Sequence, residues 1–171
     1  MSAIATFHRL NAHDLKPLLS AAAIRRKEVK RLLPFLPSRW VEHDGYGEFM
    51  ASHATELARF GYSGYAISEL ELLLQGHDAT LFGPSTLREE SAALSAARQS
   101  TAVLFDAAGA RTLRMQLQGI TLTPEEVAGH LEEEHGSREP EMVEALLAAF
   151  AQVQVWLSQV SESHIGLLQI G

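Results

Sequence analysis

A long amphipathic segment near the C-terminal end of the sequence limits what this chain can fold into. Its apolar residues recur at steps of three and four, which is the spacing of one helix face, and they are Val143, Leu146, Leu147, Phe150, Val153, Leu157 and Val160. Met142, Ala149 and Trp156 widen that face over much of the helix circumference. A helix that is apolar on so many sides has to be covered by other elements. The pattern over residues 137–161 therefore predicts a helix that serves as scaffold and does not form a functional site.

Four other segments predict β-strands. Residues 3–10, 101–106 and 165–170 are rich in apolar and β-favouring residues, and residues 111–117 alternate strictly between apolar and polar. The small residues at 107–110 predict a tight turn, so that 101–117 would form a β-hairpin. Helices are expected between the strands, over residues 14–23, 24–33, 49–60, 68–76, 86–98 and 123–135, with a loop over 40–47.

This succession predicts a single α+β domain over residues 1–171. Read coarsely as β-α-β-β-α-β, it is the split, ferredoxin-like arrangement, a four-stranded and mainly antiparallel sheet. We expect the first and last strands at the centre of that sheet. The helical block at about 40–98 would be an insertion that the sheet does not require. A helical domain with a small sheet attached is the alternative.

Three positions have the sequence of a helix start. Ser68 with Glu71, and Thr86 with Glu89, have the spacing of a capping box. Thr123 is followed directly by a proline and, three residues later, by a glutamate, which is a still stronger start signal. We expect these serine and threonine residues to cap the helices that follow them.

The composition excludes several classes of protein. There are no cysteines, which rules out a disulfide framework, a thiolate metal site, an iron–sulfur cluster and a cysteine nucleophile. The standard nucleotide-binding, metalloprotease and hydrolase motifs are missing as well, so no cofactor is predicted. The longest apolar run covers only residues 145–151, and the N-terminal segment lacks the charge order of an export signal. We therefore expect a cytoplasmic protein that does not bind membranes.

The charge distribution is uneven along the chain. The formal net charge is −7, yet residues 1–40 hold eight of the 14 lysines and arginines against two acids. On a helix over 24–33, Arg26, Lys27, Lys30 and Arg31 would lie close to one side and could bind an anion such as phosphate, RNA or an acidic partner. The competing interpretation is a solvated helix face, opposite the acidic segment 125–144 of the same or a neighbouring molecule. The net acidity and the lack of interleaved aromatic residues favour the second interpretation and argue against nucleic acid.

A group of histidine and tyrosine residues is the first place to look for catalysis. His53 would lie on the apolar face of its helix with Glu56 one turn later, and such a histidine can act as a general base. The loops that flank this helix hold His43, Asp44 and Tyr46 before it and Tyr62 and Tyr65 after it, and functional residues are often found in loops. The structural alternative is a packed histidine held by one hydrogen bond, and this is the more frequent case.

The acidic helix at 123–135 offers residue types that ligate metals. His130 and Glu134 have the spacing that places two side chains on one helix face. A closed metal site needs three or four ligands, and a single helix does not supply them. A solvated acidic face is the preferred interpretation, and we predict no metal.

The two ends of the chain resemble the uncharacterised bacterial YfbM-like proteins. The resemblance lies in the first strand leading into DLKPLL at 14–19, and in the amphipathic helix and strand at 146–170. It covers about a third of the chain and leaves residues 40–120 unmatched. It implies a compact α+β bacterial protein of unknown function, and it transfers no active-site residue.

These observations together favour a protein that acts by binding. The charge asymmetry suits electrostatically steered association with a protein partner, of an immunity, inhibitor or regulatory type. One alternative is an enzyme or small-ligand binder that uses His53, Tyr62 and Tyr65. Another is a homo-oligomeric structural protein whose broad apolar helix face is partly an interface.

Overall fold

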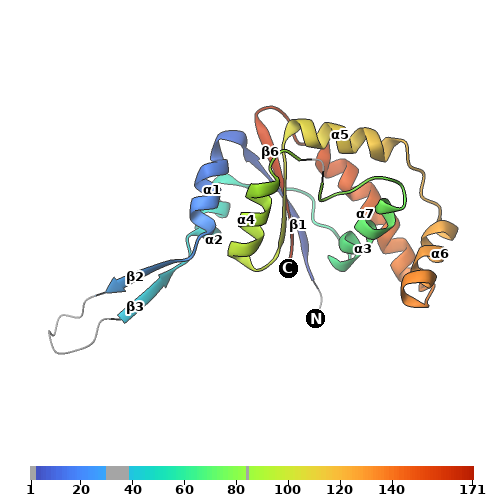
Figure 1. The fold of residues 1–171 in the computed structure, drawn as a ribbon, viewed down its shortest axis with the longest axis horizontal. Coiled ribbons are helices and arrows are strands. Elements are labelled where there is room, and N and C mark those ends of the chain that lie inside the picture. Colours follow the sequence, from blue (N-terminus) through green and yellow to red (C-terminus); the bar gives the residue numbers. More distant parts are fainter. Residues whose placement is uncertain (1–2, 30–38, 84) are drawn as a thin grey trace.

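The computed structural model describes residues 3–29, 39–83 and 85–171, and it places a β-sheet between two layers of helices (Figure 1). The elements in chain order are β1 (Ala5–Asn11), the 3₁₀ turn η1 (Ala12–Asp14), α1 (Leu15–Ala22), β2 (Arg25–Val29), β3 (Arg39–His43), α2 (Tyr46–His53), β4 (Thr55–Glu56), α3 (Tyr65–Gln75), α4 (Arg88–Arg98), β5 (Thr101–Phe105), α5 (Ala107–Gln118), α6 (Pro124–His135), α7 (Pro140–Leu157) and β6 (His164–Ile170).

The main sheet has four strands in the order β4-β1-β6-β5, and every neighbouring pair is antiparallel. The first and last strands of the chain lie at its centre, with β1 paired to β6 along the full length of both. The predicted α+β fold with a four-stranded antiparallel sheet is therefore confirmed. Strands β2 and β3 form a second sheet of their own, separate from the first.

Alternation along the strands divides the interior into two cores. On β1, Ala5 and Phe7 enter the larger core, whereas Leu10 enters the smaller one on the other face. Helices α3, α5, α6 and α7 supply the larger core, and α1, α2 and α4 supply the smaller one. Because both faces of the sheet are buried, β5 and β6 are nearly continuous apolar runs and do not alternate between apolar and polar residues.

A stack of aromatic rings lies against a glycine at the centre of the larger core. The Phe7 ring lies 5.3 Å from that of Trp156 and 6.0 Å from that of Phe105, measured between centroids. The Trp156 indole N–H donates to the Ala58 carbonyl (3.0 Å), so its polar atom is satisfied. Gly166 on β6 has no side chain, and the Phe7 ring occupies the space where one would stand. Strand β6 therefore needs glycine at this position.

Helix α4 seals the free edge of β5. The Ser95 hydroxyl accepts from the Ala102 N–H (2.9 Å) and lies 3.0 Å from the Ala102 carbonyl oxygen, to which it donates. One turn earlier, the Ser91 hydroxyl accepts from the Leu104 N–H (2.9 Å). These are the backbone groups that an edge strand would otherwise offer to another chain. Two serines at i and i+4 thus take the place of a fifth strand.

The structure corrects the predicted hairpin at 101–117. Its first strand is β5, but residues 107–118 form helix α5, which Asp106 caps by accepting from the Gly109 N–H (2.7 Å). Leu113 and Leu117 are four residues apart and both buried, so they satisfy helical spacing as well as strand alternation. Met115 completes the alternation and is exposed. The place beside β1 is taken instead by β4, which lies inside the helix expected at 49–60.

Two neighbouring predictions are also wrong. Residues 25–29 form strand β2, not the start of a helix over 24–33, and residues 39–43 form strand β3 where a loop was expected over 40–47. Arginine, lysine and glutamate favour helix locally, so pairing with a distant strand overrides that preference. The rest of the expected helix, 30–33, lies outside the described residues.

Only one of the three predicted caps is observed. The Thr123 hydroxyl accepts from the Glu126 N–H (3.2 Å) at the start of α6, as expected. Ser68 lies inside α3 instead, and the buried Glu71 holds the loop after that helix by accepting from the Leu81 N–H. The Thr86 hydroxyl donates to Asp106 rather than capping α4.

The scaffold helix is confirmed as α7, somewhat shorter than predicted. Among the described residues, no helix is both long enough and apolar enough to cross a bilayer.

Candidate functional site

Strands β2 and β3 form an arm that extends away from the three layers (Figure 1). They pair antiparallel from Arg25 opposite His43 to Val29 opposite Arg39. The chain enters the arm after α1 and returns from it into α2. Residues 30–38, which connect the two strands, are not among the described ones. The name arm is used below for β2 and β3 together.

The register gives the arm two different faces. Directly opposed residues of an antiparallel pair share a face, and successive residues alternate between faces. Arg25, Lys27 and Arg39 therefore belong to one face, with a histidine and two valines. The other face holds Arg26 and Trp40 together with both acids of the arm, Glu28 and Glu42. One face is thus cationic without any acid, and we call it the cationic face.

A cluster of polar side chains, the anchor, fixes the base of the arm. Asp44 directly follows β3, and its Oδ1 accepts from the Tyr46 N–H (3.0 Å) and from Arg98 Nη1 (2.8 Å). The Arg98 guanidinium lies 4.5 Å from the centroid of the Tyr46 ring, a cation–π contact. The Tyr46 hydroxyl donates to Gln169 Oε1 (2.8 Å). The anchor therefore joins the arm to α2, to the end of α4 and to β6.

The anchor is built for position and not for proton transfer. Burial raises the pKa of Tyr46 to about 12, while the Arg98 cation and the hydrogen bond to Gln169 act in the opposite direction and Asp44 adds to the rise. The hydroxyl is therefore neutral at physiological pH and remains a hydrogen-bond donor. The Arg98 side chain is 21% exposed and that of Asp44 is 45% exposed, so the pair lies at the surface and contributes mainly by orienting the guanidinium over the Tyr46 ring.

The predicted anion-binding residues fall on the arm, but not in the predicted arrangement. Arg26 and Lys27 are consecutive residues of β2 and belong to opposite faces of it. Lys30 and Arg31 lie outside the described residues. The helix that would have grouped all four is not formed at 25–29, so the cationic face defined by the register replaces that group.

The four predicted catalytic residues are not brought together. His53 is exposed rather than buried, stacks on Phe49 with 4.4 Å between ring centroids, and its Nδ1 lies 3.1 Å from the Phe49 carbonyl oxygen. Glu56 is exposed on the short strand β4. Tyr62 lies in a loop and donates to Glu144 Oε1 of α7 (2.8 Å). His53 and Tyr62 thus belong to elements that pack on opposite faces of the sheet.

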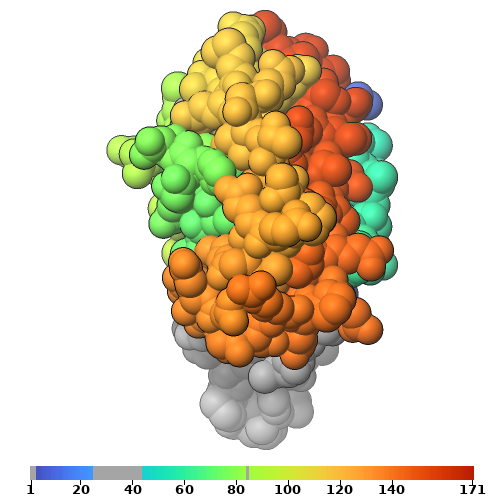
Figure 2. Space-filling view, turned by 90° about the vertical axis from the view of Figure 1, so that its right-hand side faces the viewer, coloured from blue at the N-terminus to red at the C-terminus, as the bar shows by residue number. Residues whose placement is uncertain are grey.

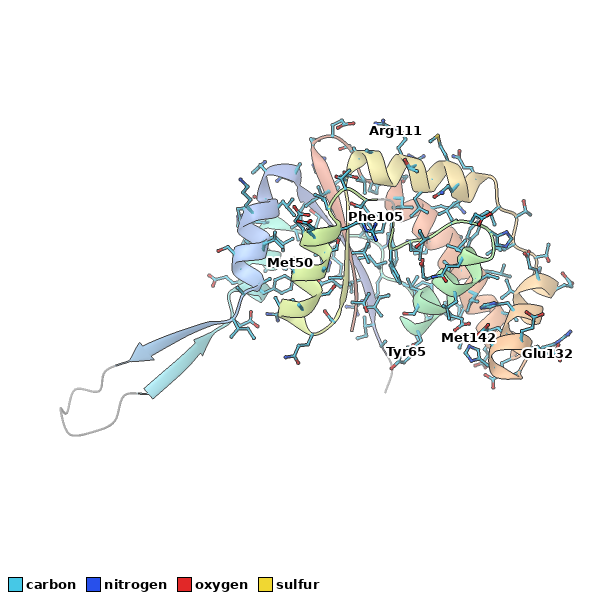
Figure 3. All side chains as sticks on the ribbon, in the orientation of Figure 1. Met50, Tyr65, Phe105, Arg111, Glu132 and Met142 are labelled. Carbon is cyan, nitrogen blue, oxygen red and sulfur yellow. The ribbon has the colours of Figure 1, made fainter. Side chains whose placement is uncertain are left out.

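Tyr65 opens α3, and it lines a cavity of about 590 Å³ with Ser68 and Ser100 beside the end of β6. In Figure 3 its side chain lies at the edge of the molecule, near the N-terminal segment. It is 56% exposed. Within the described residues, the Tyr65 side chain makes no hydrogen bond to a general base.

The proposed metal ligands have a different partner from the one predicted. His130 Nε2 lies 2.9 Å from Glu69 Oε1, and His135 Nε2 lies 3.0 Å from Glu69 Oε2. Glu134 is exposed and takes no part. Glu69 belongs to α3, so one carboxylate ties α6 to α3 through two histidines. Within the part of the chain that the structure describes, no three such residues are placed to hold a metal ion.

Sequence reasoning singled out the loop that contains Asp44 and Tyr46, but it missed Arg98 and Gln169 and therefore the anchor as a unit. Asp44, Tyr46, Arg98 and Gln169 come from three separated stretches of the chain, and no spacing pattern links them. The local signals were Asp44-Gly45, which is typical of a turn that begins an element, and the tyrosine at position 46 that follows it.

Comparison of this chain with known protein families, with curated proteins and with solved structures gives no match. The resemblance of the two ends to YfbM-like proteins therefore stays a prediction.

Proposed function

We propose that this chain is a binding protein of the bacterial cytoplasm, and that it recognises an acidic surface of a protein partner through the arm. The observation that carries the proposal is a two-stranded sheet that stands apart from both cores and is fixed at its base by the anchor. A two-stranded hairpin alone is only marginally stable in water. An arm held out in this way adds little to the stability of the body, so binding is the role that suits it. Immunity, inhibitor and regulatory proteins are the types that fit such a role.

The charge of the arm selects the kind of partner. Residues 25–43 hold six lysines and arginines against two acids, whereas the whole chain has a net charge of −7. A cationic arm on an acidic body is attracted to an acidic surface and steers its approach. Nucleic acid carries a higher density of negative charge along its length than an acidic polypeptide does, so the acidic body repels it more strongly, which disfavours that alternative.

The test compares the full chain with a variant in which an Asn-Gly turn replaces residues 25–43. Arg25 and His43 are paired neighbours, so a two-residue turn can join the flanking residues, Ile24 and Asp44. The probes are fluorescent poly-glutamate, as an acidic polypeptide, and a DNA duplex of about 20 base pairs. Binding is followed by fluorescence anisotropy at several salt concentrations.

We expect the full chain to bind poly-glutamate with an affinity that falls as salt is added, and the armless variant to lose at least about tenfold. Far-UV circular dichroism and the melting temperature should show that the armless variant keeps its fold. Equal binding by the two proteins would overturn the proposal. Tighter binding of the duplex than of poly-glutamate at about 150 mM salt would replace the protein partner with nucleic acid.

A further inference from the structure

A cavity of about 590 Å³ lies at the end of the main sheet where β5 begins and β6 ends. Its polar lining comes from the first turn of α3 and from the turn that joins α4 to β5. These polar side chains are Tyr65, Ser68, Gln99, Ser100 and Thr101. Ala3 and Ile170 add apolar wall. Sites for small molecules typically measure about 300–1,000 Å³, so the cavity has the size of a ligand site.

Backbone contacts fix the wall of the cavity on the side of α3. Gly64 directly precedes this helix, and its N–H donates to the Ala3 carbonyl (2.8 Å). A Cβ at Gly64 would lie 2.9 Å from the Ala5 nitrogen, so the start of α3 lies as close to β1 as glycine allows. Next to this contact, Ile4 and Gly171 exchange two backbone hydrogen bonds (2.8 and 3.1 Å). The wall therefore needs little rearrangement to hold a ligand, which lowers the entropy cost of binding.

The polar side chains of the cavity are neutral and available for hydrogen bonding. They comprise four hydroxyl groups and one amide, and none of them makes a hydrogen bond to another described residue. A hydroxyl group can donate and accept, and the amide offers two donors and an acceptor. A charged ligand would lose its hydration here without meeting an opposite charge among the lining side chains. The lining thus suits a neutral ligand that carries several hydroxyl groups.

Gln99 has a backbone conformation that favours glycine. It ends α4 with φ 50° and ψ 40°, which is the left-handed region. Glycine adopts this conformation at helix ends without the steric cost that a Cβ brings. Glutamine at this position lowers stability, and what it adds is an amide that lines the cavity. Backbone strain of this kind is concentrated at ligand sites, which supports a binding role for Gln99.

The acidic surface of the molecule lies elsewhere. Residues 123–144 hold eight acids, which belong to α6, to the start of α7 and to the turn between these helices. Figure 2 views the molecule from this end, and these elements form the surface nearest the viewer. None of the residues that line the cavity belongs to α6, to α7 or to the arm. The cavity is therefore separate from both the acidic and the basic part of the chain.

We propose that the cavity binds a neutral saccharide of one or two rings. Sugar hydroxyls can donate to and accept from the hydroxyl groups and the amide of the lining. The ring of Tyr65 is largely exposed, and it offers apolar surface to the C–H groups of a sugar ring. The cavity shares no residue with the arm, so this inference goes beyond the proposed function and does not depend on it.

The experiment follows the backbone amides of the isotope-labelled full chain by NMR while a sugar is added to about 20 mM, because small polar ligands bind weakly. The neutral probes are glucose, galactose, N-acetylglucosamine, maltose and lactose. Glucosamine and glucuronic acid are the charged counterparts. The variants are Tyr65→Ala and Gln99→Gly. The matched control is Asp78→Gly, because Asp78 also has a positive φ (54°) and does not line the cavity.

We expect at least one neutral sugar to shift the amide signals of Ser100 and Thr101 with a dissociation constant below about 20 mM. Tyr65→Ala should weaken this binding about tenfold. Gln99→Gly should weaken it by about two- to tenfold through loss of the amide, and it should raise the melting temperature by about 2–4 °C because the strain is relieved. Asp78→Gly should raise the melting temperature in the same way and leave sugar binding unchanged. A Gln99 with a structural role alone would not give these opposite changes in stability and binding.

Three results would overturn the inference. The first is that no neutral sugar shifts these amide signals at about 20 mM. The second is that a charged counterpart binds as tightly as the best neutral sugar. The third is an unchanged sugar affinity in both Tyr65→Ala and Gln99→Gly, which would place binding elsewhere. The armless variant should bind the sugar as the full chain does, so failure of the proposed function and failure of this inference are separate outcomes.

Discussion

Replacing Gly166 with alanine tests whether the aromatic stack fixes the sequence of β6. An added Cβ would lie 2.4 Å from Cζ of Phe7 and 2.9 Å from Cγ2 of Val160. Carbon atoms in ordinary contact are about 3.5–4.0 Å apart, so the Phe7 ring would have to move by more than about 1 Å. Its movement is restricted, because both Trp156 and Phe105 stack on it in a buried core.

The expected cost follows from two opposing effects. Overpacking of a filled core typically costs about 1–3 kcal/mol, and a ring stacked on two other aromatic rings places this site at the upper end. Alanine also restricts the unfolded chain more than glycine does, which returns about 0.4–1 kcal/mol. We therefore expect Gly166→Ala to lower the free energy of unfolding by about 2 kcal/mol. Urea unfolding followed by circular dichroism and by tryptophan fluorescence measures it.

A matched control makes the same chemical change where no clash exists. Gly129 lies inside α6, and apart from the nearby backbone of that helix no atom lies within 4 Å of the Cβ that alanine would add there. Gly129→Ala should therefore stabilise the protein by about 0.5–1 kcal/mol. A Phe7→Leu background should reduce the cost of Gly166→Ala by about 1 kcal/mol or more, because the ring that clashes is gone. Equal stability of Gly166→Ala and wild type, or no coupling to Phe7, would refute this reasoning.

Two further predictions concern Tyr46 and the sealed edge of β5. The pKa of Tyr46 is about 12 in the folded protein and about 10 in the unfolded chain. As the pH rises above 10, the tyrosine of the unfolded chain therefore loses its proton first. This lowers the free energy of unfolding by about 1.4 kcal/mol at pH 11. Urea titrations from about pH 9 to 11 should show that Tyr46→Phe lacks this part of the decline, and identical slopes would contradict it. Ser95→Ala should lower the free energy of unfolding by about 1–2 kcal/mol, because the Ala102 backbone loses both hydrogen bonds to the hydroxyl. The control Ser52→Ala removes only an exposed hydrogen bond within α2 and should cost less. Hydrogen exchange at the Ala102 amide should quicken in Ser95→Ala, and an unchanged rate would show that the serine does not protect the edge.

The parts of the fold that could be predicted are those that local sequence determines. The central strands are short apolar segments bounded by turn residues, and Thr123 before a proline marks the start of α6 whatever surrounds it. The prediction of a strand at 111–117 was wrong, because seven residues are too few to distinguish the two-residue period of a strand from the 3.6-residue period of a helix. Leu113 and Leu117 fit both.

The arm and the anchor could not be predicted, because both depend on residues that are distant in the sequence. Residues 25–29 are good helix formers taken alone, and only their pairing with residues 39–43 makes them a strand. The anchor depends on Arg98 and Gln169 reaching the base of the arm from α4 and β6. The sequence correctly marks this region as basic. Which residues share a face, however, is decided by the strand register and not by a helix.

The position of β6 between β1 and β5 has a consequence for how the protein is made. Those two strands have no pairing with each other, and both depend on residues 164–170 for their longest ladder. During synthesis, β1 is exposed to the cell for as long as it takes the ribosome to add about 150 more residues, roughly 8–30 s at about 5–20 residues per second. From its own synthesis until β6 emerges, each of the two strands lacks its β6 neighbour and has an open edge on that side. The stage most vulnerable to aggregation is therefore the nascent chain before β6 emerges, and a chaperone that shields β1 would act within that time.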